Sequence, residues 1–483
     1  MNRPTRRLAV GVMICFGLLA LMSTWVQVLA ADDYRLDPRN ARFNLAQTGK
    51  ERGLIVSADG VVLARSDPDP NSPGTYVRVY PEADAFTHVV GYASLLFGEN
   101  GLERIYSADL RSRRDLTISD LIAVILGRDL RPDNLQLTLD AQLQRTAQAA
   151  LDGQAGSVVA LNPQTGEILA MVSFPSFDPA LLLGPDAAER WQALVDDPAR
   201  PLADRTTREL YPPGSTFKVI VTGAALESGV AGPETSFPDL AEFPLPGSDS
   251  TISNFDGQVC NDGVSVTLQQ AFVRSCNTTF ANLAIQVGAV EIGGVANAFG
   301  FNNPIESPWT VATSNFPTSQ LSDDQAALGQ SGIGERDVRA TPLQMALVAA
   351  GVANDGVVMN PYLVERIFDA DGADQEMAEQ SPLRTALNPA TAEVLTQLME
   401  RVVTSGTGRR AAVPGHRVAG KTGTASGPGG QPHAWFIGFA PVENPTIALA
   451  VLVEAGGNVG ETATGGGVAA PVAAEVFAEW LNR

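Results

Sequence analysis

The N-terminal stretch from Leu8 to Ala31 constrains this chain most, because it is uncharged and mostly apolar throughout. As a helix it is long enough to cross a bilayer, which takes roughly 20 residues. Arg3, Arg6 and Arg7 precede it. Since positively charged flanks stay on the cytoplasmic side, we expect residues 1–7 to be a cytoplasmic tail, residues 8–31 to be a single membrane span, and the chain after Asp32 to fold outside the cell membrane.

A cleaved signal peptide is the competing interpretation of this stretch. Val28-Leu29-Ala30 resembles a small-residue cleavage site. Signal peptides, however, have an apolar region of roughly 7 to 15 residues, and this one is longer. A retained anchor is therefore favoured.

Composition limits what the rest of the chain can be. An apolar fraction of 45% over 483 residues is that of a globular chain with several domains. The formal charge of −20 argues against a nucleic-acid partner, since phosphate binding needs clustered cations.

Lysine is scarce, and two of its three positions lie in short motifs. Lysine and arginine together number 33, but lysine occurs only as Lys50, Lys218 and Lys421. A desolvated lysine can lose its proton and act as a base, whereas arginine cannot. Lys218 and Lys421 are therefore candidate catalytic residues.

Hydrophobic patterns predict two regions after the anchor. Residues 52–56 and 61–64 flank Asp59-Gly60 as a hairpin, within an otherwise irregular segment that extends to residue 133. Residues 134–483 form the second region. There we expect strands at 135–139, 158–161, 168–172, 434–439 and 447–453, and helices at 141–151 and 469–481. The intervening chain is mainly helical, so one sheet is built from both ends of this region.

Ser215 is the candidate nucleophile. Tyr211-Pro212-Pro213-Gly214 cannot continue a helix, so Ser215 is expected in the first turn of a helix that continues to Leu226. Unpaired N–H groups and the helix dipole there favour an oxyanion. Lys218 lies one turn later on the same face, where its amine can reach the serine hydroxyl.

Two further motifs follow, and together the three carry a resemblance. Ser275-Cys276-Asn277 and Lys421-Thr422-Gly423-Thr424 come after Ser215-Thr216-Phe217-Lys218 in the order of serine acylating enzymes such as penicillin-binding proteins and class A β-lactamases. The chain resembles the class B penicillin-binding proteins, and among them the short actinobacterial members. The resemblance covers nearly the whole chain, and the segments that extend it are 52–60, 101–103, 204–218, 341–346, 406–408, 418–425 and 433–441.

The resemblance implies a fold and a set of partners. It implies a mixed α+β penicillin-binding transpeptidase fold over 134–483, with an antiparallel sheet flanked by helices and an all-helical subdomain. Residues 32–133 are then a β-rich, irregular, non-catalytic domain that serves as a pedestal or binds partners. A membrane glycosyltransferase and cell-division proteins are the implied protein partners.

The resemblance also implies residue roles in D-Ala-D-Ala transpeptidation. Ser215 attacks a peptidoglycan stem peptide and carries its acyl group until the amine of another stem takes it; β-lactams acylate the same serine. Lys218 accepts the serine proton, Ser275 relays it, and Asn277 holds Lys218 and the substrate. Lys421 supplies positive potential. The remaining roles concern binding: Thr422, Gly423 and Thr424 bind the donor, and the N–H groups of Ser215 and Thr424 form the oxyanion hole.

Other functions compete with this one. A β-lactamase or D,D-carboxypeptidase of the same fold would need a base for water. Glu167 lies in a second predicted hairpin, formed by the strands at 158–161 and 168–172, and is expected to be exposed rather than to fill that role. A non-catalytic division scaffold is a second alternative. Residues 415–422 satisfy the phosphate-loop pattern, but the glycines after Thr422 disfavour the helix that a nucleotide site needs.

The cysteines leave two interpretations open. Cys15 lies in the membrane stretch, so Cys260 and Cys276 are the only pair outside it. They form either a disulfide, which an extracytoplasmic location permits, or two buried thiols. No residues have metal-ligand spacing, and no cofactor is expected.

Overall fold

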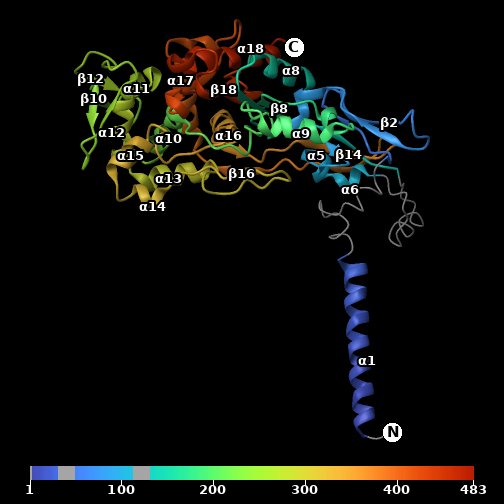
Figure 1. Cartoon of the computed structure of the whole chain (residues 1–483). Coiled ribbons are helices and arrows are strands. Elements are labelled where there is room, and N and C mark those ends of the chain that lie inside the picture. Colours follow the sequence, from blue (N-terminus) through green and yellow to red (C-terminus); the bar gives the residue numbers. More distant parts are fainter. Residues whose placement is uncertain (1–2, 31–48, 112–130) are drawn as a thin grey trace.

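The structure is a computed structural model that describes residues 3–30, 49–111 and 131–483. Helix α1 (Arg3–Thr24) continues into a π-helical turn, η1 (Trp25–Leu29). It lies outside the folded body (Figure 1), and none of its residues is buried. In the described part of the chain it is the one unbroken helix that is long and apolar enough to cross a membrane. Residues 1–2 of the predicted tail and Ala31 of the predicted span lie outside the described residues.

An antiparallel sheet of five strands forms the centre of the larger region, in the order β17-β18-β19-β7-β8. Strands β7 and β8 come from the start of this region, and β17, β18 and β19 come from its end. Both ends of the region therefore supply the sheet, as predicted. Every residue of β18 and β19 is buried, because helices cover both faces. The strands are β7 (Gly156–Leu161), β8 (Ile168–Phe174), β17 (Ala419–Ala425), β18 (His433–Ala440) and β19 (Ile447–Val453).

Two hydrophobic clusters lie on the two faces of this sheet. On one face, α8 (Ala141–Ala150) and α18 (Ala470–Leu481) pack on each other and on the strands. On the other face, α16 (Pro342–Ala353) crosses β19, β18 and β7. Figure 1 shows this layered arrangement, with the C-terminal helix at the top of the view.

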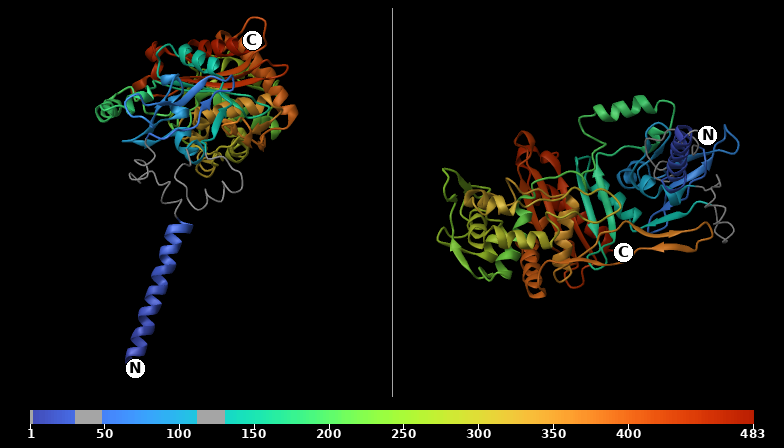
Figure 2. Two further views of the ribbon diagram at one scale, coloured as in Figure 1. Left: turned by 90° about the vertical axis from the view of Figure 1, so that its right-hand side faces the viewer. Right: turned by 90° about the horizontal axis from the view of Figure 1, so that it is seen from below.

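The chain between β8 and β17 is mainly helical. Its part from α11 (Leu268–Arg274) to α15 (Gln325–Ser331) lies beside the sheet at one end of the molecule (Figures 1 and 2). Besides α16 the helices of the whole segment between β8 and β17 are α9 (Ala187–Asp196), α10 (Lys218–Glu227), α11 (Leu268–Arg274), α12 (Asn277–Val287), α13 (Ala289–Ala298), α14 (Thr318–Leu321), α15 (Gln325–Ser331) and α17 (Pro389–Thr404). It also contains short strand pairs that the hydrophobic pattern did not predict, since strands of three to four residues show no clear alternation. These are β9 (Ser236–Pro238) with β12 (Ser265–Thr267), β10 (Glu242–Pro244) with β11 (Thr251–Ser253), and β13 (Val357–Met359) with β16 (Pro382–Thr385).

A second sheet, of six strands, joins the N-terminal region to the larger one. Its order is β15-β14-β6-β1-β2-β3. The hairpin predicted around Asp59-Gly60 is present as β1 and β2. Strand β6 starts at Asn134, where we placed the domain boundary, and it pairs with strands from both sides of that boundary. The strands are β1 (Ile55–Val56), β2 (Val62–Pro68), β3 (Tyr76–Val79), β6 (Asn134–Leu137), β14 (Val364–Phe368) and β15 (Asp374–Met377).

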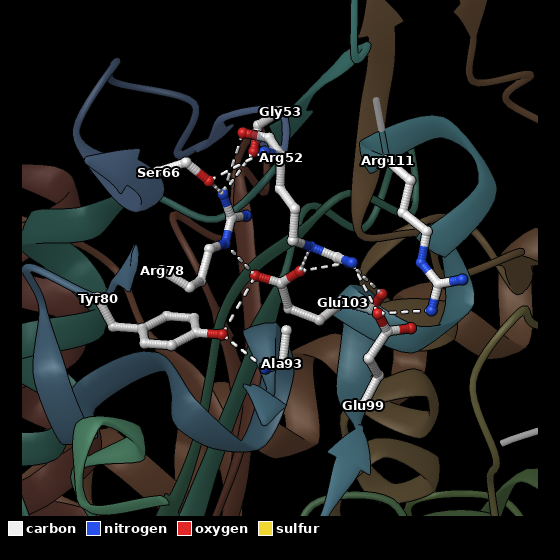
Figure 3. A network of polar contacts seen from close by, with 9 residues as sticks. All are labelled: Arg52, Gly53, Ser66, Arg78, Tyr80, Ala93, Glu99, Glu103 and Arg111. Carbon is white, nitrogen blue, oxygen red and sulfur yellow. Dashed lines mark hydrogen bonds and ion pairs between the residues drawn. The ribbon is translucent and has the colours of Figure 1, made fainter. Parts of the chain in front are cut away.

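A buried ion network holds the N-terminal region together (Figure 3). Glu103 is fully buried and pairs with Arg78 at 2.6 Å and with Arg52 at 2.8 Å. Burial alone would raise the pKa of Glu103, but Arg78 and Arg52 outweigh it and hold that pKa below its ordinary value. The remaining elements of this region are α4 (Thr87–Val90), β4 (Ala93–Ser94), β5 (Gly98–Glu99), α5 (Gly101–Ile105) and α6 (Ser107–Leu110).

Candidate active site

Ser215 lies in a 3-10 turn, η4 (Gly214–Phe217), that leads directly into α10. The predicted helix is therefore present, but its first turn is tighter than an α-helix. Gly214 has φ +53°, and a Cβ there would lie 2.6 Å from the carbonyl oxygen of Thr424. Only glycine lets this turn approach β17 so closely.

The second close contact between the serine turn and β17 is made at Gly423. A Cβ on Gly423 would meet the carbonyl oxygen of Pro213 at 2.9 Å and the side chain of Thr216 at 3.0 Å. The absence of a side chain therefore lets the strand lie against the turn that carries Ser215. Gly423 thus contributes to the shape of the site by allowing this close packing.

Ser275 joins the two lysines. It ends α11 in the left-handed conformation, with φ 66°, which costs a non-glycine residue about 1–3 kcal/mol. Lys421 Nζ donates to Ser275 Oγ at 2.8 Å. Lys218 Nζ donates to the Ser275 carbonyl oxygen at 2.8 Å and lies 3.4 Å from Ser275 Oγ.

Asn277 fixes the other side of Lys218. Its Oδ1 accepts from Lys218 Nζ at 2.8 Å, while its Nδ2 donates to the carbonyl oxygen of Ser253 at 3.1 Å. Asn254 Oδ1 in turn accepts from the backbone N–H of Asn277 at 2.9 Å. The start of α12 is thereby tied to the β10–β11 hairpin.

Both lysines are fully buried, and in the described part of the chain neither forms an ion pair with a carboxylate. Burial, and then the neighbouring Lys421, lower the pKa of Lys218 well below its ordinary value. Burial lowers the pKa of Lys421 to about 7. Phenyl rings contribute to the desolvation: Lys218 Nζ lies 5.3 Å from the centre of the Phe280 ring, and Lys421 Nζ lies 5.7 Å from that of Phe272. The cluster can therefore hold an uncharged amine near neutral pH.

The expected hydrogen bond between Lys218 and Ser215 is not formed in the structure. Among the hydrogen bonds of the described residues, none joins Lys218 Nζ to Ser215 Oγ; the amine is directed to Ser275 and Asn277 instead. Helical spacing places the two side chains on the same face, but it does not decide which acceptor the amine chooses. Catalytic hydrogen bonds commonly tighten only when substrate is bound.

The motifs converge on one cavity of about 520 Å³. Ser215, Ser275, Asn277, Thr422 and Thr424 all line it. Thr422 Oγ1 lies 2.6 Å from Thr407 Oγ1, and Thr424 Oγ1 accepts from the N–H of Gly465 at 3.3 Å. The two threonine hydroxyls thus stand at one wall of the cavity, on β17.

The two cysteines outside the predicted membrane span are joined in the structure. Cys260 and Cys276 form a disulfide across 16 residues of sequence, with their Cα atoms 6.2 Å apart. Both residues line the cavity, and Cys276 lies between Ser275 and Asn277. The bridge connects the loop that contains Cys260 to the motif Ser275-Cys276-Asn277.

The cavity also contains residues that the sequence motifs did not indicate. Among them are Arg274, Arg410 and Glu335, together with the exposed Phe255. Thr407 also lines the cavity, and it lies in segment 406–408, which the resemblance included. Arg274 directly precedes the motif Ser275-Cys276-Asn277, which was a usable signal. Glu335 lies in a loop with no chemical pattern around it, so only the fold brings it to the site.

The positions of Lys421, Thr422 and Glu167 bear on two alternative interpretations of the sequence, a nucleotide site and a base for water. Lys421 and Thr422 lie inside strand β17, whereas a phosphate loop requires a helix after them, so the nucleotide-site pattern is coincidental. Glu167 is half-buried rather than exposed, accepts a hydrogen bond from the Tyr362 hydroxyl at 3.1 Å, and is not among the residues that line the cavity.

Comparison with protein families agrees with this geometry. Residues 156–478 match the family model described as the penicillin binding protein transpeptidase domain. The chain belongs to this family. Residues 52–135 match the model of a penicillin binding protein A dimerisation domain.

Relatives and solved structures show which members of the family this chain is similar to. The peptidoglycan D,D-transpeptidase PbpA of Mycolicibacterium smegmatis is 44% identical over the full length of both chains. That of Mycobacterium tuberculosis is 41% identical over 99% of this chain and 98% of its own. Structures of the M. tuberculosis penicillin-binding protein A superpose well: its ceftriaxone acyl-enzyme has a TM-score of 0.83 at 39% identity, and its penicillin G acyl-enzyme 0.82 at 40%. They cover 90% and 89% of this chain, and 99% and 100% of their own. The predicted resemblance to the short actinobacterial members is confirmed.

Proposed function

We propose that this chain is a membrane-anchored serine D,D-transpeptidase that crosslinks peptidoglycan stem peptides through an acyl-Ser215 intermediate. The observation that carries the residue assignment is the pair of buried lysines bridged by Ser275, beside a cavity that Ser215 lines. The named relatives are peptidoglycan D,D-transpeptidases, and solved relatives are β-lactam acyl-enzymes. β-Lactams are therefore inhibitors that acylate the same serine.

In the first half-reaction the proton of Ser215 goes to uncharged Lys218 as the oxygen attacks the carbonyl of the penultimate D-Ala. The C–N bond to the terminal D-Ala then breaks, and Ser275 passes the proton from Lys218 to the departing amine. Lys421 holds positive potential beside Ser275, and Asn277 fixes Lys218. The hydroxyls of Thr422 and Thr424 bind the donor carboxylate, and the N–H groups of Ser215 and Thr424 stabilise the oxyanion.

The localisation proposal rests on the N-terminal arginines and helix α1. A single span with residues 1–7 in the cytoplasm places the catalytic region outside the membrane, where the stem peptides are assembled into wall. A membrane glycosyltransferase is the proposed partner, because the class B penicillin-binding proteins that this chain resembles lack a glycan-polymerising domain.

Replacement of Ser215 tests the central assignment. Ser215→Ala removes the attacking oxygen, so labelling by fluorescent penicillin is expected to disappear while the protein stays folded. The measurement is in-gel fluorescence together with intact-protein mass after exposure to benzylpenicillin. Thr216→Ser, which alters the neighbouring hydroxyl residue, serves as the control and should remain labelled. Persistent adduct on Ser215→Ala would place the nucleophile elsewhere.

The disulfide is proposed as part of the native enzyme outside the membrane. A thiol count on denatured, unreduced protein should find Cys15 free and Cys260 and Cys276 oxidised. Three free thiols would show that the pair is reduced.

A further inference from the structure

Glu335 is the one partly buried carboxyl group among the described residues that line the cavity. The only other acid in that lining is Asp256, which is exposed and accepts the N–H of Gln258 in a turn. The remaining ionisable side chains in the lining are Arg274 and Arg410, both exposed. An acid that lines the same cavity as Ser215, and forms no ion pair with an arginine among the described residues, needs an explanation.

The backbone around Glu335 is fixed against the catalytic turn. The N–H of Gly214 donates to the carbonyl oxygen of Gly334 at 2.9 Å. Gly334 has φ +79°, and a Cβ there would lie 2.0 Å from the carbonyl oxygen of Gly214. Glu335 therefore follows a residue that touches the one before Ser215.

The side chain of Glu335 reaches the other arm of the site. Its Oε1 accepts from the N–H of Ser426 at 2.9 Å, two residues beyond Thr424. No ion pair of Glu335 is formed among the described residues; Arg339 exerts only a weaker electrostatic effect on it. Burial raises the pKa of Glu335 above its ordinary value.

In the second half-reaction the amine of another stem attacks the acyl-enzyme. This step has a proton requirement that the lysines do not meet. An alkylamine with a pKa near 10.4 is uncharged in only roughly one molecule in a few thousand at neutral pH. Its ammonium form must lose one proton before it attacks and a second as the amide forms. Lys218 can take the second proton and return it to Ser215 Oγ, so the first needs another acceptor.

We infer that Glu335 binds the ammonium group of the acceptor stem in this cavity and removes its first proton. The carboxylate becomes a carboxylic acid, and the amine nitrogen attacks the acyl carbon. The C–N bond forms as the C–Oγ bond breaks, and the second proton passes through Lys218 to Ser215 Oγ. Glu335 then releases its proton to water. The amine of the D-Ala that left in the first half-reaction takes up one proton at neutral pH, so a complete crosslink releases no net proton. This inference rests on the proposed function and specifies the acceptor as a charged amine.

Glu335→Gln tests the inference, because a glutamine oxygen can still accept from Ser426 while the charge is lost. A thioester of an N-acyl-D-alanine acylates the enzyme, and the acyl group is then partitioned between water and an added acceptor. One acceptor is a lysine-type alkylamine, charged at neutral pH; the other is hydroxylamine, which is uncharged there. Products are separated and counted by mass spectrometry. Glu306→Gln, an exposed acid outside the cavity, is the matched control.

The expected result is selective. Glu335→Gln should reduce transfer to the alkylamine about 100-fold, the usual contribution of a general base, and leave transfer to hydroxylamine close to that of the wild type. Equal losses with both acceptors would show that Glu335 only clamps the loop to β17, and no loss with either would show that it is idle; both outcomes overturn the inference. If the wild type forms no acyl-enzyme at all, the proposed function itself fails.

Discussion

Two buried cation clusters in this molecule have opposite electrostatic designs. In the N-terminal region Arg52 and Arg78 share Glu103, and Glu99 pairs with both Arg52 and Arg111 (Figure 3). In the catalytic region Lys218 and Lys421 share only the neutral Ser275. Carboxylates keep the first cluster charged. In the second, burial lowers the pKa of both lysines, and Lys421 lowers that of Lys218 further, with no carboxylate bonded to either amine among the described residues to offset this.

The difference separates a structural use of burial from a chemical one. Removing a charge from water is unfavourable, and a buried pair offsets that cost through Coulomb attraction and hydrogen bonds. Without a counter-ion, the same cost is relieved by loss of a proton, and this leaves a basic amine. The choice of arginine at one cluster and lysine at the other follows, because only lysine releases its proton in the ordinary pH range.

Lys218→Arg is expected to have the largest effect of the substitutions at the two clusters. It places a permanently charged group where an uncharged amine is needed, so the rate of acylation by penicillin should fall about 1,000-fold or more. The rate is measured by stopped-flow or quenched labelling with fluorescent penicillin. Lys50→Arg makes the same change at the remaining lysine, outside the cavity, and should keep the wild-type rate. A modest loss for Lys218→Arg would mean that another group accepts the serine proton.

Glu103→Gln examines the other cluster. It leaves two arginines buried around a neutral amide, and removal of one partner from a buried pair typically costs about 3–5 kcal/mol. The free energy of unfolding, measured by urea denaturation of the detergent-solubilised protein, should fall by that amount. Glu99→Gln, whose side chain is 14% exposed, should cause a smaller loss. Equal denaturation midpoints for wild type and Glu103→Gln would remove the structural role assigned to this network.

The pH dependence of acylation tests the protonation states assigned to Lys218 and Lys421. The active form has Lys218 uncharged and Lys421 protonated, so the rate should rise as Lys218 loses its proton and fall as Lys421 loses its own, near pH 7. Above that pH the decline should approach about tenfold per pH unit. The second-order rate constant for penicillin acylation is measured across the pH range in which the protein stays folded. A rate that keeps increasing above neutral pH would contradict the role of Lys421 as a cation.

The sequence alone predicted much of this molecule because many of its signals are local. The apolar N-terminal helix, the two predicted hairpins, strand β19 and the serine at a helix start each depend on residues within about 25 positions of one another. The resemblance then implied which serines, lysines, threonines and asparagine belong to one site. Local patterns also had limits: they missed the three- and four-residue strands β3, β9–β13, β15 and β16, which are too short to show a period. They also missed β14 and the seven-residue β17, whose Ala-Gly-Lys-Thr-Gly-Thr-Ala sequence has no apolar alternation.

Only the tertiary structure decided how these segments meet. Ser275 bonds a lysine 146 residues away, and the pKa values of both lysines follow from the burial that results. Helical spacing placed Lys218 near Ser215, yet the fold offers that amine better acceptors. Strand β6 pairs with strands from both regions, and Glu335 enters the cavity from a loop with no motif. Propensity and periodicity are properties of neighbours along the chain, whereas desolvation and hydrogen bonding depend on neighbours in space.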